Sequence, residues 1–244
     1  MVRRFAIVIA LLFAVDLWAG EPWKEKLYKD WNEKDVRKIL NESPWSKRIE
    51  VERNERTHAG LESPEDTSTA SEAAGESGEE EAGRGTEQEE KETKKNGINF
   101  VIRWGSSRTM REAWVRGQVL QKRISEVDTE KSLPPAPGDY ELLLVGPDMT
   151  LFEKTDEATL KEKSYLLAKK SKQGINPSKV EFARTSDGKR IKGIIFHFPK
   201  RTPGGEPIFA ADEKELKFLA PVGAVEIKAS FDLQKMVDKA GTDL

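Results

Sequence analysis

The stretch VEFARTSDGKRIKGIIFHFP, residues 180–199, decides the fold of this chain. Two runs rich in β-branched and aromatic residues flank the dipeptide Asp187-Gly188, which is a strong short-range signal for a β-hairpin. Along the second run, one face of the pleat carries Ile194, Phe196 and Phe198, and the other face carries Ile191 and Ile195. Because a strand that is apolar on both faces needs cover on both sides, we place this strand centrally in a sheet.

The remaining patterned segments predict an α+β fold. A helix capped by Asn32, with Asp35 three residues on, ends before Ser43-Pro44, because the residue before a proline is pushed out of the helical region. Hairpin-joined strands predict a mainly antiparallel sheet with two or three packed helices, interrupted by a disordered acidic insertion. The expected elements are strands at 48–52, 98–104 and 140–145, helices at 109–124 and 156–170, a strand pair at 215–220 and 224–233, and a turn of helix at 232–237.

Residues 54–97 form the acidic insertion. They include 13 acidic and five basic residues, and Leu61 is their single large aliphatic residue. Such a composition cannot bury enough apolar surface to offset the entropy of ordering, so we predict that the insertion is disordered. Since patterned sequence resumes beyond it, we expect residues 21–53 and 98–244 to form one α+β domain around it.

The N-terminus has the pattern of a signal peptide, residues 1–20. Arg3 and Arg4 precede an apolar run at 5–15, and Trp18-Ala19-Gly20 ends in the small residues that are typical of a signal-peptide cleavage site. The run is shorter than the roughly 20 residues that a bilayer-spanning helix needs, but it suits a secretory leader. We therefore expect an exported protein, periplasmic or extracellular, with no transmembrane span after signal removal; the alternative is an uncleaved membrane-associated segment.

The helix at 109–124 carries the candidate partner-binding surface. Thr109 and Glu112 have the spacing of a capping box. The predicted buried stripe consists of Met110, Ala113, Trp114, Gly117, Leu120 and Ile124. The opposite side is basic with two valines among the charges, which makes it a candidate for contact with an anionic envelope component or a protein. Its residues are Arg108, Arg111, Val115, Arg116, Val119, Lys122 and Arg123.

The composition argues against most catalytic chemistry. There is no cysteine, and the two histidines are His58 and His197, so disulfides and thiol nucleophiles are excluded and zinc sites are improbable. His197 lies mid-strand and its counterpart lies in the insertion, so we interpret it as structural. Glycine-rich dinucleotide fingerprints and metal-binding spacings are absent from the sequence. We expect no cofactor, no metal and no nucleic-acid partner.

Two classes of function remain. One is a non-catalytic exported module that contacts a partner or the envelope, and the other is a carboxylate-dependent hydrolase. The hydrolase needs two acidic residues at a defined separation across a cleft. The chain has 43 acidic residues, and the sequence does not identify which two would form such a pair. We favour the binding module; a cleft that holds converging carboxylates with shifted pKa values would favour the enzyme.

Two segments, DWNEKDVRKILNESPW and DEKELKFLAPVGAVEIKASFDLQKMV, resemble a family of uncharacterised exported bacterial proteins. In that family a signal peptide precedes a helix ending in Ser-Pro-Trp, and the chain closes on a strand pair and a Met-containing turn. The resemblance implies export and one domain, and it implies no activity or catalytic residue. The matching residues are Trp31, Asp35, Ile39, Leu40, Ser43, Pro44, Trp45, Glu215, Phe218, Phe231 and Met236.

We predict that the acidic insertion is dispensable for folding. Replacing residues 54–97 by a short Gly/Ser linker should change the midpoint of thermal unfolding by a few degrees, because each doubling of loop length costs only about 0.6 kcal/mol. A drop of more than about ten degrees in calorimetry would mean that the insertion packs on the domain.

Overall fold

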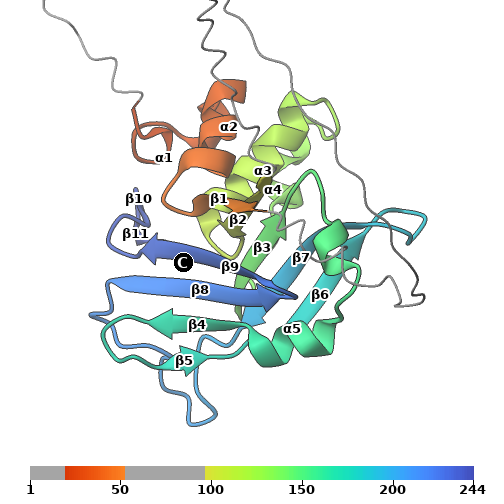
Figure 1. The fold of residues 1–244 in the computed structure, drawn as a ribbon. Coiled ribbons are helices and arrows are strands. Elements are labelled where there is room, and N and C mark those ends of the chain that lie inside the picture. The colour runs from red at the N-terminus through yellow and green to blue at the C-terminus, as the bar shows by residue number, and fades with distance from the viewer. Residues whose placement is uncertain (1–19, 53–96) are drawn as a thin grey trace, which may run out of the picture.

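The computed structural model describes residues 20–52 and 97–244. The predicted signal peptide, apart from Gly20, and the predicted insertion, apart from Gly97, lie outside the described residues. In the described part, two antiparallel sheets pack face to face (Figure 1). Helices α1 (Pro22–Glu25), α2 (Glu33–Glu42) and α3 (Arg108–Leu120) gather beside strands β1 (Ser46–Glu52) and β2 (Gly97–Trp104). This arrangement confirms the predicted α+β class with mainly antiparallel strands.

The first sheet has five strands in the order β1-β2-β3-β7-β6, and the second has four in the order β5-β4-β8-β9. The first contains β1 (Ser46–Glu52), β2 (Gly97–Trp104), β3 (Tyr140–Val145), β7 (Ile191–Phe198) and β6 (Lys179–Arg184). The second contains β5 (Gly174–Ile175), β4 (Tyr165–Ala168), β8 (Glu215–Val222) and β9 (Val225–Asp232), and a small ribbon pairs β10 (Val237–Asp238) with β11 (Gly241–Thr242).

The helices are short. They are α1 (Pro22–Glu25), α2 (Glu33–Glu42), α3 (Arg108–Leu120), α4 (Thr129–Ser132) and α5 (Glu157–Lys163), with single 3₁₀ turns η1 (Tyr28–Asp30), η3 (Glu126–Asp128) and η4 (Thr150–Phe152). Within residues 20–52 and 97–244, no helix combines the length and the apolar character that a membrane span requires.

The hairpin at 180–199 forms as predicted. Val180 pairs with Phe196 across β6 and β7, and Gly188 in the turn adopts the left-handed φ of 71° that glycine tolerates without a steric penalty. β7 is an internal strand, because β3 pairs with its other edge. The predicted strand at 98–104 is also confirmed, with Phe100, Ile102 and Trp104 buried on one face.

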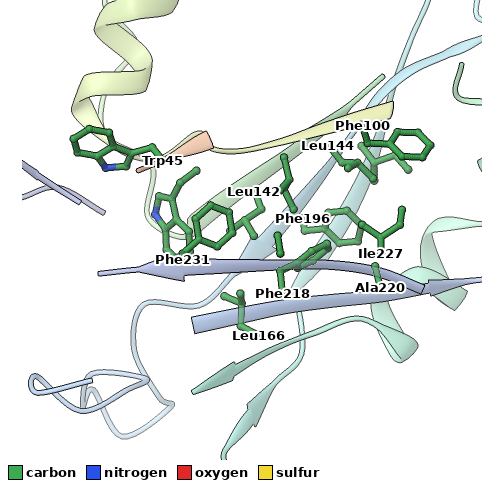
Figure 2. Packing of buried hydrophobic residues seen from close by; sticks show 14 of the residues in the cluster. Trp45, Phe100, Leu142, Leu144, Leu166, Phe196, Phe218, Ala220, Ile227 and Phe231 are labelled. Atoms are coloured by element: carbon green, nitrogen blue, oxygen red, sulfur yellow. The ribbon is translucent and has the colours of Figure 1, made fainter. Parts of the chain in front are cut away.

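The core lies between the two sheets. Leu142 and Phe196 point from the first sheet toward Phe218 and Ile227 of the second (Figure 2). The rings of Phe196 and Phe218 meet edge to face with their centroids 4.9 Å apart, an arrangement that aromatic quadrupoles favour. This layer is buried and rich in aromatic rings, so it supplies the main hydrophobic stabilisation of the fold.

The predicted N-terminal helix is confirmed as α2. The Asn32 side chain accepts the N–H of Asp35, and the Asp35 carboxylate accepts the N–H of Asn32, which completes a capping box. Trp31 and Trp45 are both buried, as expected for aromatics that pack the helix ends onto the domain. Trp45 also donates its indole N–H to the carbonyl oxygen of Asp243 at 2.6 Å, which attaches this end of α2 to the C-terminal segment.

The predicted buried stripe of the helix at 109–124 is right for Met110 and Ala113, which are buried, and wrong for Trp114. The N-cap is Ser107, which accepts the N–H of Met110, and the helix ends at Leu120. Trp114 is 54% exposed, whereas Val115 and Val119 are buried. The two valines lie about 100–140° around the helix axis from Trp114. The prediction assumed one buried stripe, but α3 also packs against α2, where Gly117 faces Val36.

Two other helix predictions are wrong. The helix that Asp156 caps ends at Lys163, and residues 165–168 form β4, in which Leu166 pairs with Phe218. At the junction between the helix and β4, the Asn176 side chain donates to the carbonyl oxygen of Ser164. This carbonyl is therefore occupied and does not accept the backbone N–H that a longer helix would require. Residues 232–237 do not form a helix: Asp232 ends β9, residues 233–235 form a turn, and Val237 begins β10.

We predict that the stability ranking of two neighbouring α3 residues is opposite to the one that the sequence pattern suggests. Val115→Ala should lower the free energy of unfolding by about 1–3 kcal/mol, since Val115 is fully buried. Trp114→Ala should lower it by less than about 1 kcal/mol, because half of the ring faces solvent. Urea denaturation of both variants measures the ranking, and the reverse order would mean that α3 is rotated about its axis.

Candidate functional site

A cavity of about 200 Å³ lies between α3 and the outer face of the five-stranded sheet. We call it the α3–sheet groove. The helix contributes Met110, Arg111 and Trp114, and the sheet contributes residues from β2, β3 and β7. The full lining consists of Leu40, Arg103, Gly105, Met110, Arg111, Trp114, Pro134, Glu141, Leu143 and Ile195.

The apolar floor of the groove follows from the two-faced pattern of β3 and β7. Leu142 and Phe196 fill the inner face of these paired strands, and Leu143 and Ile195 pair with each other on the outer face. Both outer residues are half-buried, so the cover on this side is incomplete. A strand that is apolar on both faces needs other elements to cover both faces. In the described residues the inner face of β3 and β7 is fully covered, and the outer face is covered only in part.

Arg103 is a partly buried cation in the groove wall. Its Nε donates to the carbonyl of Leu40 at 2.7 Å and its Nη2 to the side chain of Asn41 at 3.0 Å. Both acceptors lie in the last turn of α2, where backbone carbonyls carry partial negative charge. Burial lowers the pKa of Arg103. Among the described residues, no carboxylate forms an ion pair with it.

Arg111 is the second guanidinium of the groove. Its Nη1 donates to the carbonyl of Pro134 at 2.5 Å, while its buried Nε has no hydrogen-bond partner within the described part of the chain. Lys200 donates to the carbonyl of Pro137 at 2.9 Å, so two cations hold the proline-rich loop at 133–138. Burial lowers the pKa of Lys200, and the positive charge of Arg111 lowers it further, while the negative charges of Asp139 and Glu141 act in the opposite direction.

Glu141 supplies the one carboxylate of the groove lining. It lies 3.5 Å from Nδ1 of His197, and Glu181 lies 3.6 Å from Nε2 on the other side. Sequence reasoning treated His197 as isolated, because neighbours on other strands cannot be identified from one strand alone. These distances exceed those of good hydrogen bonds, and no group of His, Asp or Glu within residues 20–52 and 97–244 is arranged to hold a metal ion.

A second charged cluster surrounds the N-terminus of α3. Asp243 accepts the backbone N–H groups of Arg108 at 2.6 Å and Thr109 at 2.8 Å, and Asp238 pairs with the Arg108 guanidinium. Burial raises the pKa of Glu112 to about 7, and the negative charges of Asp243 and Asp238 contribute to the rise. Asp243 and Asp238 are thus held by helix N–H groups and by an arginine, and none of the five residues of this cluster lines the α3–sheet groove.

The basic helix face predicted as partner-binding is divided in the structure. Arg108 pairs with Asp238, and Arg116 donates to the carbonyl of Trp31 and to Glu126. Arg111 lies in the groove. Lys122 and Arg123 follow the end of the helix and are exposed. The predicted exposure of Val115 and Val119 is wrong, because the side that carries them packs inside the molecule.

Sequence reasoning missed the residues that the groove brings together with Arg111. They are Trp114, which was assigned to the buried stripe, and Arg103, Leu143 and Ile195, which lie in predicted strands and were not proposed as site residues. A signal was present in β3 and β7, since both carry large aliphatic residues on the face opposite the core. Comparisons with protein-family models, with curated proteins and with solved structures give no match, so the family resemblance stays a prediction.

We predict that Glu112 makes the protein less stable as pH rises from about 4.5 to about 7. Its pKa is raised from 4.5 to about 7, so the folded state binds the proton more tightly than the unfolded state across this window. Glu112→Gln should therefore stabilise the protein at about pH 8, by on the order of 1 kcal/mol after allowance for its partial exposure, and have little effect near pH 5.

The measurement is urea denaturation of both proteins at these two pH values. Glu162→Gln, an exposed change on α5, is the matched control and should leave the pH dependence unaltered. Identical pH slopes for the original protein and Glu112→Gln would show that Glu112 titrates normally.

Proposed function

We propose that this protein is an exported, non-catalytic binding module whose α3–sheet groove holds an anionic ligand that has an apolar part. The observation that carries the proposal is the presence of Arg103 and Arg111 in one apolar groove without a carboxylate ion-pair partner among the described residues. Removing a charge from water is costly unless an opposite charge compensates it. A bound anion would supply that compensation.

Trp114 supports a binding role independently of charge. It lies one helical turn from Met110 and about 40° around the helix axis from it, yet Met110 is buried and Trp114 is 54% exposed. The exposed ring stands at the rim of an apolar groove. Large exposed aromatics beside an apolar surface are typical of binding sites, because they lose solvent contact when a ligand or partner arrives.

The alternative, a carboxylate-dependent hydrolase, has weaker support. Its best candidate is Glu112, whose pKa lies at about 7. However, the neighbouring Asp243 and Asp238 are engaged by α3 and Arg108, and the groove itself is lined by Glu141 alone among carboxylates. A pair of free carboxylates facing one another across a cleft is the arrangement that hydrolysis requires. Export rests on the leader pattern at 1–20, and an anionic envelope component remains a natural source of the ligand.

The test is a titration of the processed chain, residues 21–244, with a panel of anions that carry apolar groups, followed by backbone amide NMR. The panel contains an alkyl sulfate, an alkyl phosphate, a fatty acid and an aromatic carboxylate, each with a neutral counterpart. We expect saturable shifts at groove residues for at least one anion and not for its neutral counterpart. The proposal fails if no anion perturbs the groove, or if a model glycoside or ester is hydrolysed in a manner that depends on Glu112.

A further inference from the structure

We propose that the ligand of the α3–sheet groove is a small monocarboxylate that carries one ring-sized apolar group, with its carboxylate at Arg103 and Arg111 and its apolar group on Leu143 and Ile195 beside Trp114. This inference rests on the proposed function and narrows it to one chemical class. Three properties of the groove lead to it: the volume, the net charge, and the division of the lining into a polar and an apolar part.

The volume limits the size of the ligand. The groove measures about 200 Å³, whereas sites for drug-sized ligands occupy about 300–1,000 Å³. A single ring with a short carboxylate side chain fits such a space. A long acyl chain or several peptide residues would extend beyond the lining into solvent and gain little contact there.

The charges of the lining fit a monoanion. Arg103 and Arg111 contribute two formal positive charges and Glu141 one negative charge, a net of one positive. A phosphate monoester with two negative charges would leave excess negative charge near Glu141. The guanidinium group presents paired N–H donors in one plane, which match the two oxygens of a carboxylate.

The apolar part of the lining fits a ring. Leu40, Met110, Leu143 and Ile195 present aliphatic surface, and the Trp114 indole stands beside them. Aromatic rings pair favourably with an indole edge to face or offset-stacked, in addition to the gain from burying apolar area. The guanidinium groups lie in the same cavity as this surface, so an acid whose ring and carboxylate are separated by a short linker can contact both.

The test uses 3-phenylpropanoate, its neutral amide 3-phenylpropanamide, and acetate, with isothermal titration of the processed chain. We expect saturable binding of 3-phenylpropanoate and binding at least about tenfold weaker for the amide and for acetate, because each lacks one of the two recognised parts. Arg111→Gln should weaken binding of the acid by about tenfold or more and leave the affinity for the amide nearly unchanged. Trp114→Ala should weaken both.

The matched control is Arg37→Gln, the same chemical change at an exposed position on α2 that does not line the groove. It should leave affinity unchanged, and thermal unfolding of every variant verifies folding. Equal affinity for the acid and the amide, or equal losses in Arg111→Gln and Arg37→Gln, would overturn the inference. A phenylalanine-ending peptide that binds more tightly than the free acid would also overturn it, by making a protein C-terminus the occupant.

Failure of this inference and failure of the proposed function give different results. If 3-phenylpropanoate does not bind but an alkyl sulfate or alkyl phosphate shifts groove residues, the carboxylate assignment is wrong. If a fatty acid shifts them instead, the ring-sized apolar group is wrong. In both cases the binding role stands. If no anion perturbs the groove, both are wrong.

Discussion

Asp243, the next-to-last residue, joins three separate parts of the molecule. Its carboxylate accepts the first free N–H groups of α3, from Arg108 and Thr109, and its carbonyl oxygen accepts the indole N–H of Trp45. A carboxylate at a helix N-terminus satisfies unpaired donors and complements the partial positive charge there. Asp238 adds a second anchor by pairing with the Arg108 side chain. The position of α3 against the sheet, and therefore the width of the groove, depends on this C-terminal segment.

Local signals predicted the elements whose stabilising contacts lie close in the sequence. The turn at Asp187-Gly188 predicted the β6–β7 hairpin, and the capping box at Asn32 predicted α2. Elements set by distant contacts were assigned wrongly. Residues 165–168 have an acceptable helical pattern, but Leu166 pairs with Phe218, more than fifty residues away. The N-cap at Ser107 and the Asp243 contact likewise set the start of α3 from outside the predicted capping box.

The candidate site was predicted in part. Arg111 was named as a partner-binding residue and lies in the groove, but it was grouped with Arg108 and Arg116, which form contacts within the protein. Helical periodicity ranks residues by direction around one axis and contains no information about which directions another element covers. Arg103 shows the same limit for a strand: alternation places it on the face opposite Ile102 and Trp104, but it does not show that this face lies under α2 and α3.

Natural sequences tend to agree with their folds at every level, and the places where they disagree are often functional. In this chain the conflicts meet at one place. Trp114 belongs to an apolar stripe but is exposed, Arg103 is charged but partly buried, and Leu143 and Ile195 are aliphatic but only half covered. Each of these features alone costs stability or leaves hydrophobic stabilisation incomplete. One anion with an apolar group would relieve all of them together, since its charge would pair with the guanidinium groups while its apolar surface covered the sheet and the indole.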